Sequence, residues 1–219
     1  MISVVGRRLA VALVVVVAAA GVAAVADRGD RAGTASAMSL CGGVKRWQVK
    51  TLSDLPGPGA PRLKRDAERR TVDSLVAQSH PAIGNTTPRQ PAVESTKYVL
   101  KDVTLVEAKV EADQDVHLVI RDDHNPPTDA MIVEFPNIAC NVTAPTVYRN
   151  QIAKARAAVA ELLPACRSGF VKGWAQFRAG TTATIRGVGF FDIRHGNDLH
   201  GVAGNEVELH PVLSFRGTC

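Results

Sequence analysis

Six polar side chains with acid–base or metal-binding capacity fall on or beside β-prone segments in the second half of the chain. They are His117, Glu134, Asp192, His195, Glu208 and His210. Neutral imidazoles and carboxylates together suit zinc and similar ions, and the same groups transfer protons in metal-free catalysis. The residue types therefore predict one polar site, in which His117, Glu134 and His210 are the candidate ligands of a divalent metal such as zinc.

Two other interpretations of these residues stay open. In the first, they form an acid–base site without a cofactor, in which Glu134 or Asp192 orients a histidine. In the second, they lie on a solvated outer face and are held only by His–carboxylate hydrogen bonds. The sequence shows no GxSxG, HExxH or P-loop pattern, so no stronger catalytic signature decides between the interpretations.

The elements that must position these side chains are strands with alternating polarity. Strands are predicted at residues 46–52, 98–110, 116–121, 131–135, 182–191 and 207–215. Successive side chains of a strand point to opposite faces. The alternation therefore turns His117, Glu134, Glu208 and His210 away from the apolar faces of their strands, with Asp192 and His195 at the end of a neighbouring strand.

The order of the elements predicts the fold class. A helix is expected between the third and fourth strands of the main domain, beginning near Pro145 and ending at Pro164, with apolar residues at steps of three and four. Three strands, a helix and two strands is the order of a five-stranded OB-fold barrel, and Gly187 and Gly189 fit its sharp coiling. The predicted fold is mostly β with one or two helices, an OB-like barrel with an N-terminal extension. A generic α+β sandwich is the alternative.

The start of the chain predicts export. Arg7 and Arg8 precede an apolar run at residues 9–25, and small residues follow just before Asp27, as in a cleavable signal peptide. The same run kept as a membrane anchor is the alternative; no second apolar run follows, so no span is expected after cleavage. The predicted divisions are a signal peptide at 1–26, a flexible lead-in at 27–40, an extension with a strand and a short helix (64–78) at 41–97, and the barrel at 98–219.

Four cysteines in an exported chain predict two disulfides. The favoured pairs are Cys140 with Cys166, which bracket the long helix, and Cys41 with Cys219, which bracket the whole domain. Two other pairings are open. Metal binding by these cysteines is not expected, because no two have the close spacing of a zinc motif.

The net charge of +5 says little about partners. Arg7 and Arg8 belong to the signal, so the remaining chain is near 5 − 2 = +3. Residues 98–219 hold twelve Lys and Arg against fourteen Asp and Glu. A slightly acidic barrel argues against a strong electrostatic funnel for nucleic acid.

Several short motifs carry a family resemblance. They are Asp115-Val116-His117-Leu118, Glu134-Phe135-Pro136 with Cys140, Gly187-Val188-Gly189-Phe190-Phe191-Asp192 with His195, and Glu208-Leu209-His210-Pro211-Val212. In their order the chain resembles a group of exported bacterial OB-fold-like proteins of uncharacterised function, over about residues 45–215. It departs from the group at Gly204-Asn205-Glu206, where Asn-Gly is expected. The resemblance implies a fold and an extracytoplasmic location, and no activity.

The function expected from the sequence is that of an exported, non-catalytic binding or accessory module at or outside the cell envelope. Its partner is expected to be an oligosaccharide, a nucleic acid or an envelope protein. The alternative is a metal-dependent hydrolase, such as a nuclease, that uses His117, Glu134, Glu208 and His210. A purely structural envelope domain is a third interpretation.

Overall fold

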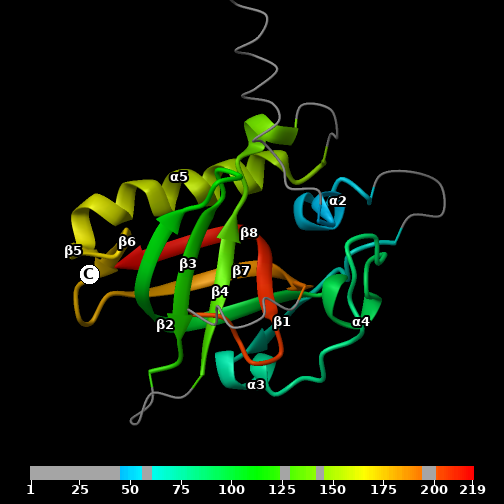
Figure 1. Ribbon diagram of the computed structural model, residues 1–219, viewed down its shortest axis with the longest axis horizontal. Helices are drawn as coiled ribbons and strands as arrows, with labels where there is room; N and C mark the ends of the chain where they lie inside the picture. The colour runs from blue at the N-terminus through cyan, green and yellow to red at the C-terminus, as the bar shows by residue number, and fades with distance from the viewer. Residues whose placement is uncertain (1–44, 56–60, 124–128, 142–145, 194–200) are drawn as a thin grey trace, which may run out of the picture.

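A computed structural model describes residues 45–55, 61–123, 129–141, 146–193 and 201–219 (Figure 1). The elements are α2 (Trp47–Thr51), β1 (Ala67–Arg70), α3 (Val72–Val76), α4 (Pro91–Glu94), β2 (Lys97–Val110), β3 (Val116–Arg121), β4 (Ala130–Phe135), a 3-10 helix (Ile138–Asn141), α5 (Arg149–Cys166), β5 (Arg167–Val171), β6 (Trp174–Phe177), β7 (Thr182–Phe191) and β8 (Val207–Thr218). The predicted signal peptide and lead-in lie outside the described residues. Within the described residues, no helix combines the length and apolar character that a membrane crossing requires.

Five strands close into a barrel. β2 pairs antiparallel with both β3 and β7, β3 pairs with β4, and β8 pairs with β7. β4 and β8 lie parallel and complete the circuit. The order β2–β3–β4–β8–β7, with α5 between β4 and β7, is that of an OB fold, so the predicted fold class is confirmed.

The strand β2 closes the barrel because it is long enough to serve two neighbours. Its first half pairs with β7 and its second half with β3. Leu118, Val133 and Leu209, which alternate with the polar candidates, are fully buried in the barrel core. Gly189 serves a close approach, since a Cβ there would lie 2.7 Å from the ring of Tyr98.

The helix α5 packs against the barrel through Ala155 and Val159, which are buried in the main core. The expected end at Pro164 is wrong, because α5 continues to Cys166. Proline removes only one backbone donor and disturbs the turn before it. A helix that ends two residues later therefore tolerates it.

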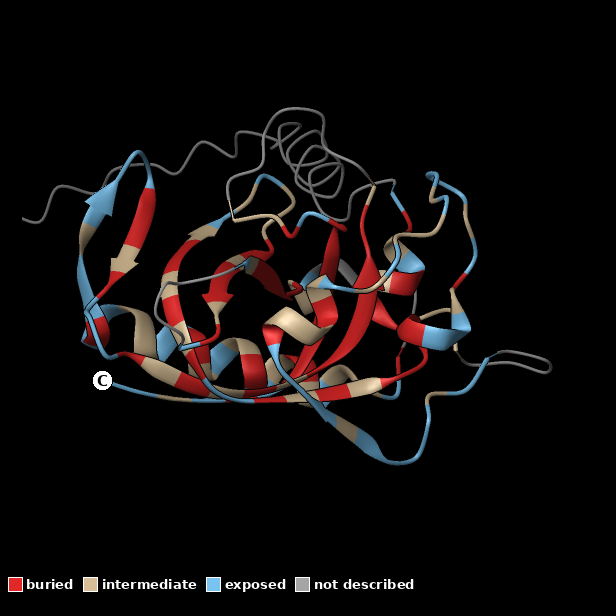
Figure 2. Cartoon of the chain, turned by 90° about the horizontal axis from the view of Figure 1, so that it is seen from below, coloured by how far each residue is buried: buried red, intermediate tan, exposed pale blue. Residues whose placement is uncertain are grey.

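A hairpin of β5 and β6 was not predicted. Its two-residue turn, Lys172-Gly173, has positive φ at both positions, as a type I′ turn requires. β6 pairs with β2, whereas β5 forms the outer edge and is mostly exposed (Figure 2). The hairpin escaped prediction because β5, with Arg167, Ser168 and Gly169, lacks a regular alternation.

The N-terminal extension folds differently from the prediction. Residues 47–51 form the short helix α2 instead of a strand, between Arg46 and Leu52, which both have positive φ. The Arg46 guanidinium donates to the buried carboxylate of Glu94 and to the carbonyl oxygen of Phe191. Because this tertiary anchor decides the local conformation, an alternation of five residues could not reveal it.

The expected helix at residues 64–78 is also mostly wrong. Residues 67–70 form β1, which pairs parallel with the start of β2. Only Val72–Val76 are helical, beginning at a capping box in which Thr71 and Ser74 exchange hydrogen bonds. Thr71 is of a residue type that favours the N-cap position, and it marks the true start of the helix.

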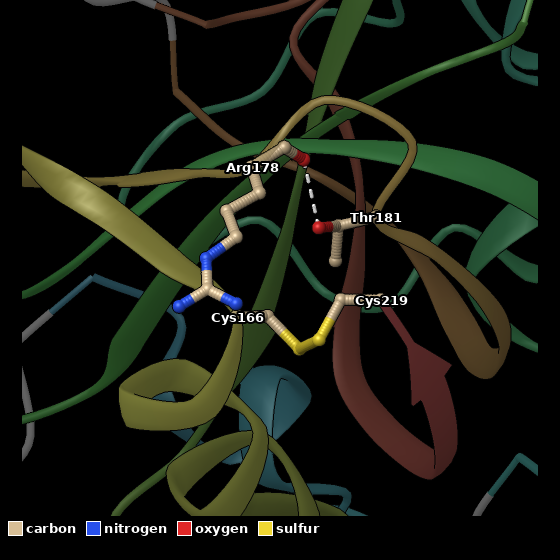
Figure 3. The surroundings of a disulfide bond; sticks show 4 residues. All are labelled: Cys166, Arg178, Thr181 and Cys219. Atoms are coloured by element: carbon tan, nitrogen blue, oxygen red, sulfur yellow. Dashed lines mark hydrogen bonds between the residues drawn. A yellow bond between two sulfur atoms is a disulfide. The ribbon is translucent and has the colours of Figure 1, made fainter.

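A disulfide joins Cys166, the last residue of α5, to Cys219 at the end of β8 (Figure 3). The predicted pairs Cys140–Cys166 and Cys41–Cys219 are therefore wrong. The reason is spatial: α5 packs along β8, which brings two residues 53 positions apart to a Cα–Cα distance of 5.7 Å. Cys41 lies outside the described residues, and the Cys140 side chain is not described.

Candidate functional site

The outer face of β3, β4 and β8 collects four of the predicted polar residues. His117 of β3 lies directly opposite Glu134 of β4 in the antiparallel ladder. Glu208 of β8 lies beside Ile132 in the parallel ladder, so His210, two residues on, reaches the level of Glu134. These four side chains are called the His–Glu cluster below.

Glu134 is the centre of the His–Glu cluster. Its Oε1 lies 3.2 Å from Nε2 of His117, and its Oε2 lies 2.6 Å from Nδ1 of His210. The same Nδ1 of His210 lies 3.9 Å from Oε2 of Glu208. Each imidazole thus faces a different oxygen of Glu134, and Glu208 lies next to His210.

The second nitrogen of each imidazole faces another carboxylate. Nδ1 of His117 lies 3.1 Å from Oε1 of Glu111, and Nε2 of His210 lies 3.5 Å from Oδ2 of Asp115. The other oxygen of Asp115 accepts a hydrogen bond from the backbone of Asn137, which fixes the carboxylate. Glu111 and Asp115 were not predicted as site residues, although both come just before His117 in the chain.

A lysine from α2 enters the same region. Nζ of Lys50 lies 3.8 Å from Oε2 of Glu134 and 3.8 Å from Oδ2 of Asp192. Asp192 thereby joins the predicted set through Lys50, whereas His195 lies outside the described residues. Sequence reasoning missed Lys50 because it treated residues 46–52 as a strand, and nothing in their pattern points to β4.

The interpretation of these side chains as a solvated outer face is wrong. His210 is 0% exposed, and Glu134 and Glu208 are each 3% exposed. The helix α2 packs against β8 on this side and brings Lys50 over the cluster. The outward faces of these strands are therefore a second, polar interior beneath the N-terminal extension.

The two glutamates of the cluster are driven to different protonation states. Burial raises the pKa of Glu134, but Lys50, His210 and His117 outweigh burial and hold the pKa well below its ordinary value. Burial and the neighbouring Glu134 charge raise the pKa of Glu208 to about 7. Near neutral pH, Glu134 is therefore ionised, and Glu208 keeps a proton for much of the time.

The bases respond to the same carboxylates. Burial lowers the pKa of His210, but attraction to Glu134 dominates and sets the pKa well above its usual range. The pKa of His117 is raised for the same reason, with a hydrogen bond to Glu111 adding to the effect of Glu134. Burial opposes a charge on Lys50, yet Glu134 and Asp192 raise its pKa above the ordinary value. In the absence of another cation, bound protons offset much of the negative charge.

Two sets of three side chains have ligand atoms within 4.8 Å of one another, as a metal ion requires. They are Asp115, Glu134 and His210, and His117, Glu134 and Glu208. The predicted ligands His117, Glu134 and His210 are divided between the two sets, and Glu134 belongs to both. Metal binding stays a prediction that this geometry permits.

The chain is thus an OB-fold barrel with a buried cluster of imidazoles, carboxylates and one lysine on its outer face. Comparisons with protein-family models, curated proteins and solved structures gave no match. The resemblance to exported bacterial proteins stays a prediction.

Proposed function

We propose that the chain is an exported, non-catalytic binding module whose ligand is a small cation held at the buried cluster. The observation that carries this proposal is geometric: the buried Lys50 ammonium lies 3.8 Å from carboxylate oxygens of both Glu134 and Asp192, and Glu134 also contacts two imidazoles. Isolated buried carboxylates are costly unless a cation or proton accompanies them. A site of this composition favours positive charge.

The negative charge of these carboxylates disfavours binding of a polyanion. OB folds commonly bind oligonucleotides and oligosaccharides on the face of their second and third strands, which here are β3 and β4. In this chain Glu134 lies on that face, with α2 and Lys50 beside it. Phosphate binding depends on basic side chains. Nucleic acid is therefore the least supported of the ligands expected from the sequence.

Export rests on the apolar segment at residues 9–25 and is supported by the disulfide. Cys166 and Cys219 form a bridge between the last turn of α5 and the end of β8. Disulfides of this structural kind persist in oxidising compartments outside the cytoplasm. We therefore place the binding function at or beyond the cell envelope.

One observation favours a second function, that of a metal-dependent hydrolase. The low pKa of Glu134 and the raised pKa of Glu208, about 7, resemble the divergent pair of an acid–base mechanism. Burial argues the other way, because His210, Glu134 and Glu208 expose almost no surface to a substrate. A buried site of this kind suits an ion better than an organic molecule.

The test is a thermal-shift comparison on untagged protein purified from an exporting host and stripped of metal. Zinc chloride, spermidine, a single-stranded oligonucleotide and a chito-oligosaccharide are added separately. Zinc at about 100 times its Kd should stabilise by roughly 2.7 kcal/mol, which corresponds to roughly 5–10 °C in Tm for a chain of this size. The anionic and neutral ligands should have no effect.

The matched controls are two Glu→Gln variants. Glu134→Gln should lose the shift, whereas Glu68→Gln, at an exposed position on β1, should keep it. Stabilisation by the oligonucleotide or the oligosaccharide alone would overturn the cationic ligand. Hydrolysis of phosphodiester or ester substrates that disappears in Glu134→Gln would establish the enzyme instead.

A further inference from the structure

Each histidine of the His–Glu cluster has one nitrogen on the cluster and the other on a carboxylate behind it. For His117 the outer partner is Glu111, at 3.1 Å, and for His210 it is Asp115, at 3.5 Å. Histidines that bind metal ions commonly donate their second nitrogen to a carboxylate, which fixes the tautomer and the ring orientation. The same arrangement thus occurs twice around one region.

The inner nitrogens and oxygens are close without being hydrogen-bonded. Nδ1 of His210 and Oε2 of Glu134 are 2.6 Å apart, yet both are buried atoms that form no hydrogen bond of ordinary geometry among the described residues. Nε2 of His117 and Oε2 of Glu208 are in the same condition. The outer atoms Nδ1 of His117, Nε2 of His210 and Oδ2 of Asp115 also form no such hydrogen bond. Buried nitrogens and oxygens that converge without forming hydrogen bonds of ordinary geometry provide ligand atoms for a further cation, which displaces the bound protons.

We propose that His117, Glu134 and Glu208, whose ligand atoms lie within 4.8 Å of one another, bind one divalent transition-metal ion. His210 joins them as the fourth ligand, and Glu111 and Asp115 orient the two imidazoles. This inference rests on the proposed function and names the cation. Ligand atoms on a tetrahedral ion with bonds of about 2.1 Å lie roughly 3.4 Å apart. The distances from Glu134 to His117, 3.2 Å, and from His210 to Glu208, 3.9 Å, bracket that value. The 2.6 Å contact between Glu134 and His210 must open, and His210 must move toward the ion, since it shares no set of close ligand atoms with His117.

The ligand types select the class of ion. Two imidazoles with two carboxylates suit zinc and its first-row neighbours, whereas magnesium and calcium prefer sites built from oxygen alone. The competing set of Asp115, Glu134 and His210 is a weaker choice. In that set Asp115 approaches Nε2 of His210, while Glu134 approaches Nδ1, and one imidazole nitrogen cannot serve both directions.

Lys50 marks the region as one that accepts positive charge. Its ammonium lies 3.8 Å from Glu134, on the same oxygen that faces His210. A metal ion bound between the ligands repels this ammonium, which retains Asp192 as its second partner at 3.8 Å. Lys50 therefore competes with the ion for Glu134 without having to leave the protein interior.

The test is calorimetric titration of the metal-free, untagged exported protein with zinc chloride, and separately with magnesium chloride. We expect close to one zinc ion per chain and no saturable binding of magnesium. Glu208→Gln, which keeps the side-chain volume, and His117→Ala, at the least buried of the four positions, should each weaken zinc binding at least tenfold. The exposed control Glu68→Gln should bind zinc like the wild type.

Glu111→Gln separates a metal site from a structural ion-pair network. Glu111 lies outside the ligand set and is partly exposed, so its loss should leave the protein folded. Loss of such an outer partner typically weakens metal binding 10–100-fold, and we expect that result here. Undiminished zinc binding in both Glu208→Gln and His117→Ala overturns the ligand assignment.

Titration with different cations separates the transition-metal site from the more general cation-binding function. Binding of magnesium or spermidine without zinc overturns the transition-metal inference and supports the cationic binding function. Absence of binding by zinc, magnesium and spermidine alike overturns both proposals.

Discussion

Lys50→Met replaces a buried ammonium by an apolar side chain of similar length. The Lys50 ammonium lies 3.8 Å from carboxylate oxygens of both Glu134 and Asp192. At about 4 Å and an effective dielectric constant of about 20, one such pair is worth roughly 4 kcal/mol of Coulomb attraction. The saved desolvation of the ammonium offsets part of this loss. Breaking a buried pair by removing one partner typically costs about 3–5 kcal/mol.

The expected result is a metal-free variant that melts roughly 6–20 °C below the wild type, at about 2–4 °C per kcal/mol for this chain length. Zinc should restore much of this loss, because the ion supplies the positive charge that Lys50 supplied. Its effect on Tm should be larger in the variant than in the wild type, since the repulsion between ammonium and ion is gone.

The assay is thermal unfolding followed by circular dichroism, with and without zinc, on the wild type, Lys50→Met and Lys101→Met. Lys101 is exposed on β2, so its variant should stay within about 0.5 kcal/mol of the wild type. Equal melting temperatures of Lys50→Met and Lys101→Met would show that the Lys50 ion pairs do not stabilise the fold. A smaller effect of zinc on Lys50→Met than on the wild type would show that Lys50 does not compete with the ion.

Three further outcomes are expected. The pKa of Glu208 is about 7 in the folded protein, against an ordinary value of 4.5. Because the folded-state pKa of this acid is raised, the free energy of unfolding falls as pH rises from 4.5 to 7. The expected loss is on the order of 3 kcal/mol, at about 1.36 kcal/mol per pKa unit. In urea unfolding across this range, the free energy of unfolding of Glu208→Gln should rise relative to that of the metal-free wild type as pH rises. A difference between the two that does not change with pH would show that the pKa of Glu208 is not raised by burial. Non-reducing peptide mapping should recover Cys166 linked to Cys219, whereas a Cys140–Cys166 peptide would contradict the structure. The two cysteines are 53 residues apart, so removing the bridge should lower the free energy of unfolding by about 4 kcal/mol in the chain-entropy model. N-terminal sequencing of exported protein should begin at or near Asp27, and recovery of the intact chain only in membranes shows an anchor instead.

The barrel could be predicted because its strands carry a strict alternation. Residues 116–121 and 182–191 were predicted as strands and are strands over the same residues. A period of two identifies the strand and also assigns each side chain to a face. From the sequence alone, the same rule predicts that four polar side chains point away from the core: His117, Glu134, Glu208 and His210.

The environment of that face could not be predicted, because it depends on contacts between distant segments. Lys50 reaches Glu134 because α2 is anchored by the ion pair between Arg46 and Glu94, two residues 48 positions apart in the chain. The disulfide partner of Cys166 depends on how α5 lies along β8. Secondary-structure propensity and the spacing of apolar residues describe one segment at a time. They do not indicate which segments pack against each other.

Metal analysis of the untagged protein, isolated from an exporting host without chelators, shows whether the His–Glu cluster binds a metal ion. We expect close to one zinc or other first-row transition-metal ion per chain in the wild type, and a large loss of that ion in Glu208→Gln. Protein that contains almost no metal, and that takes up none after dialysis against zinc, would rule out a metal site. The His–Glu cluster would then be a structural network held by Lys50 and bound protons.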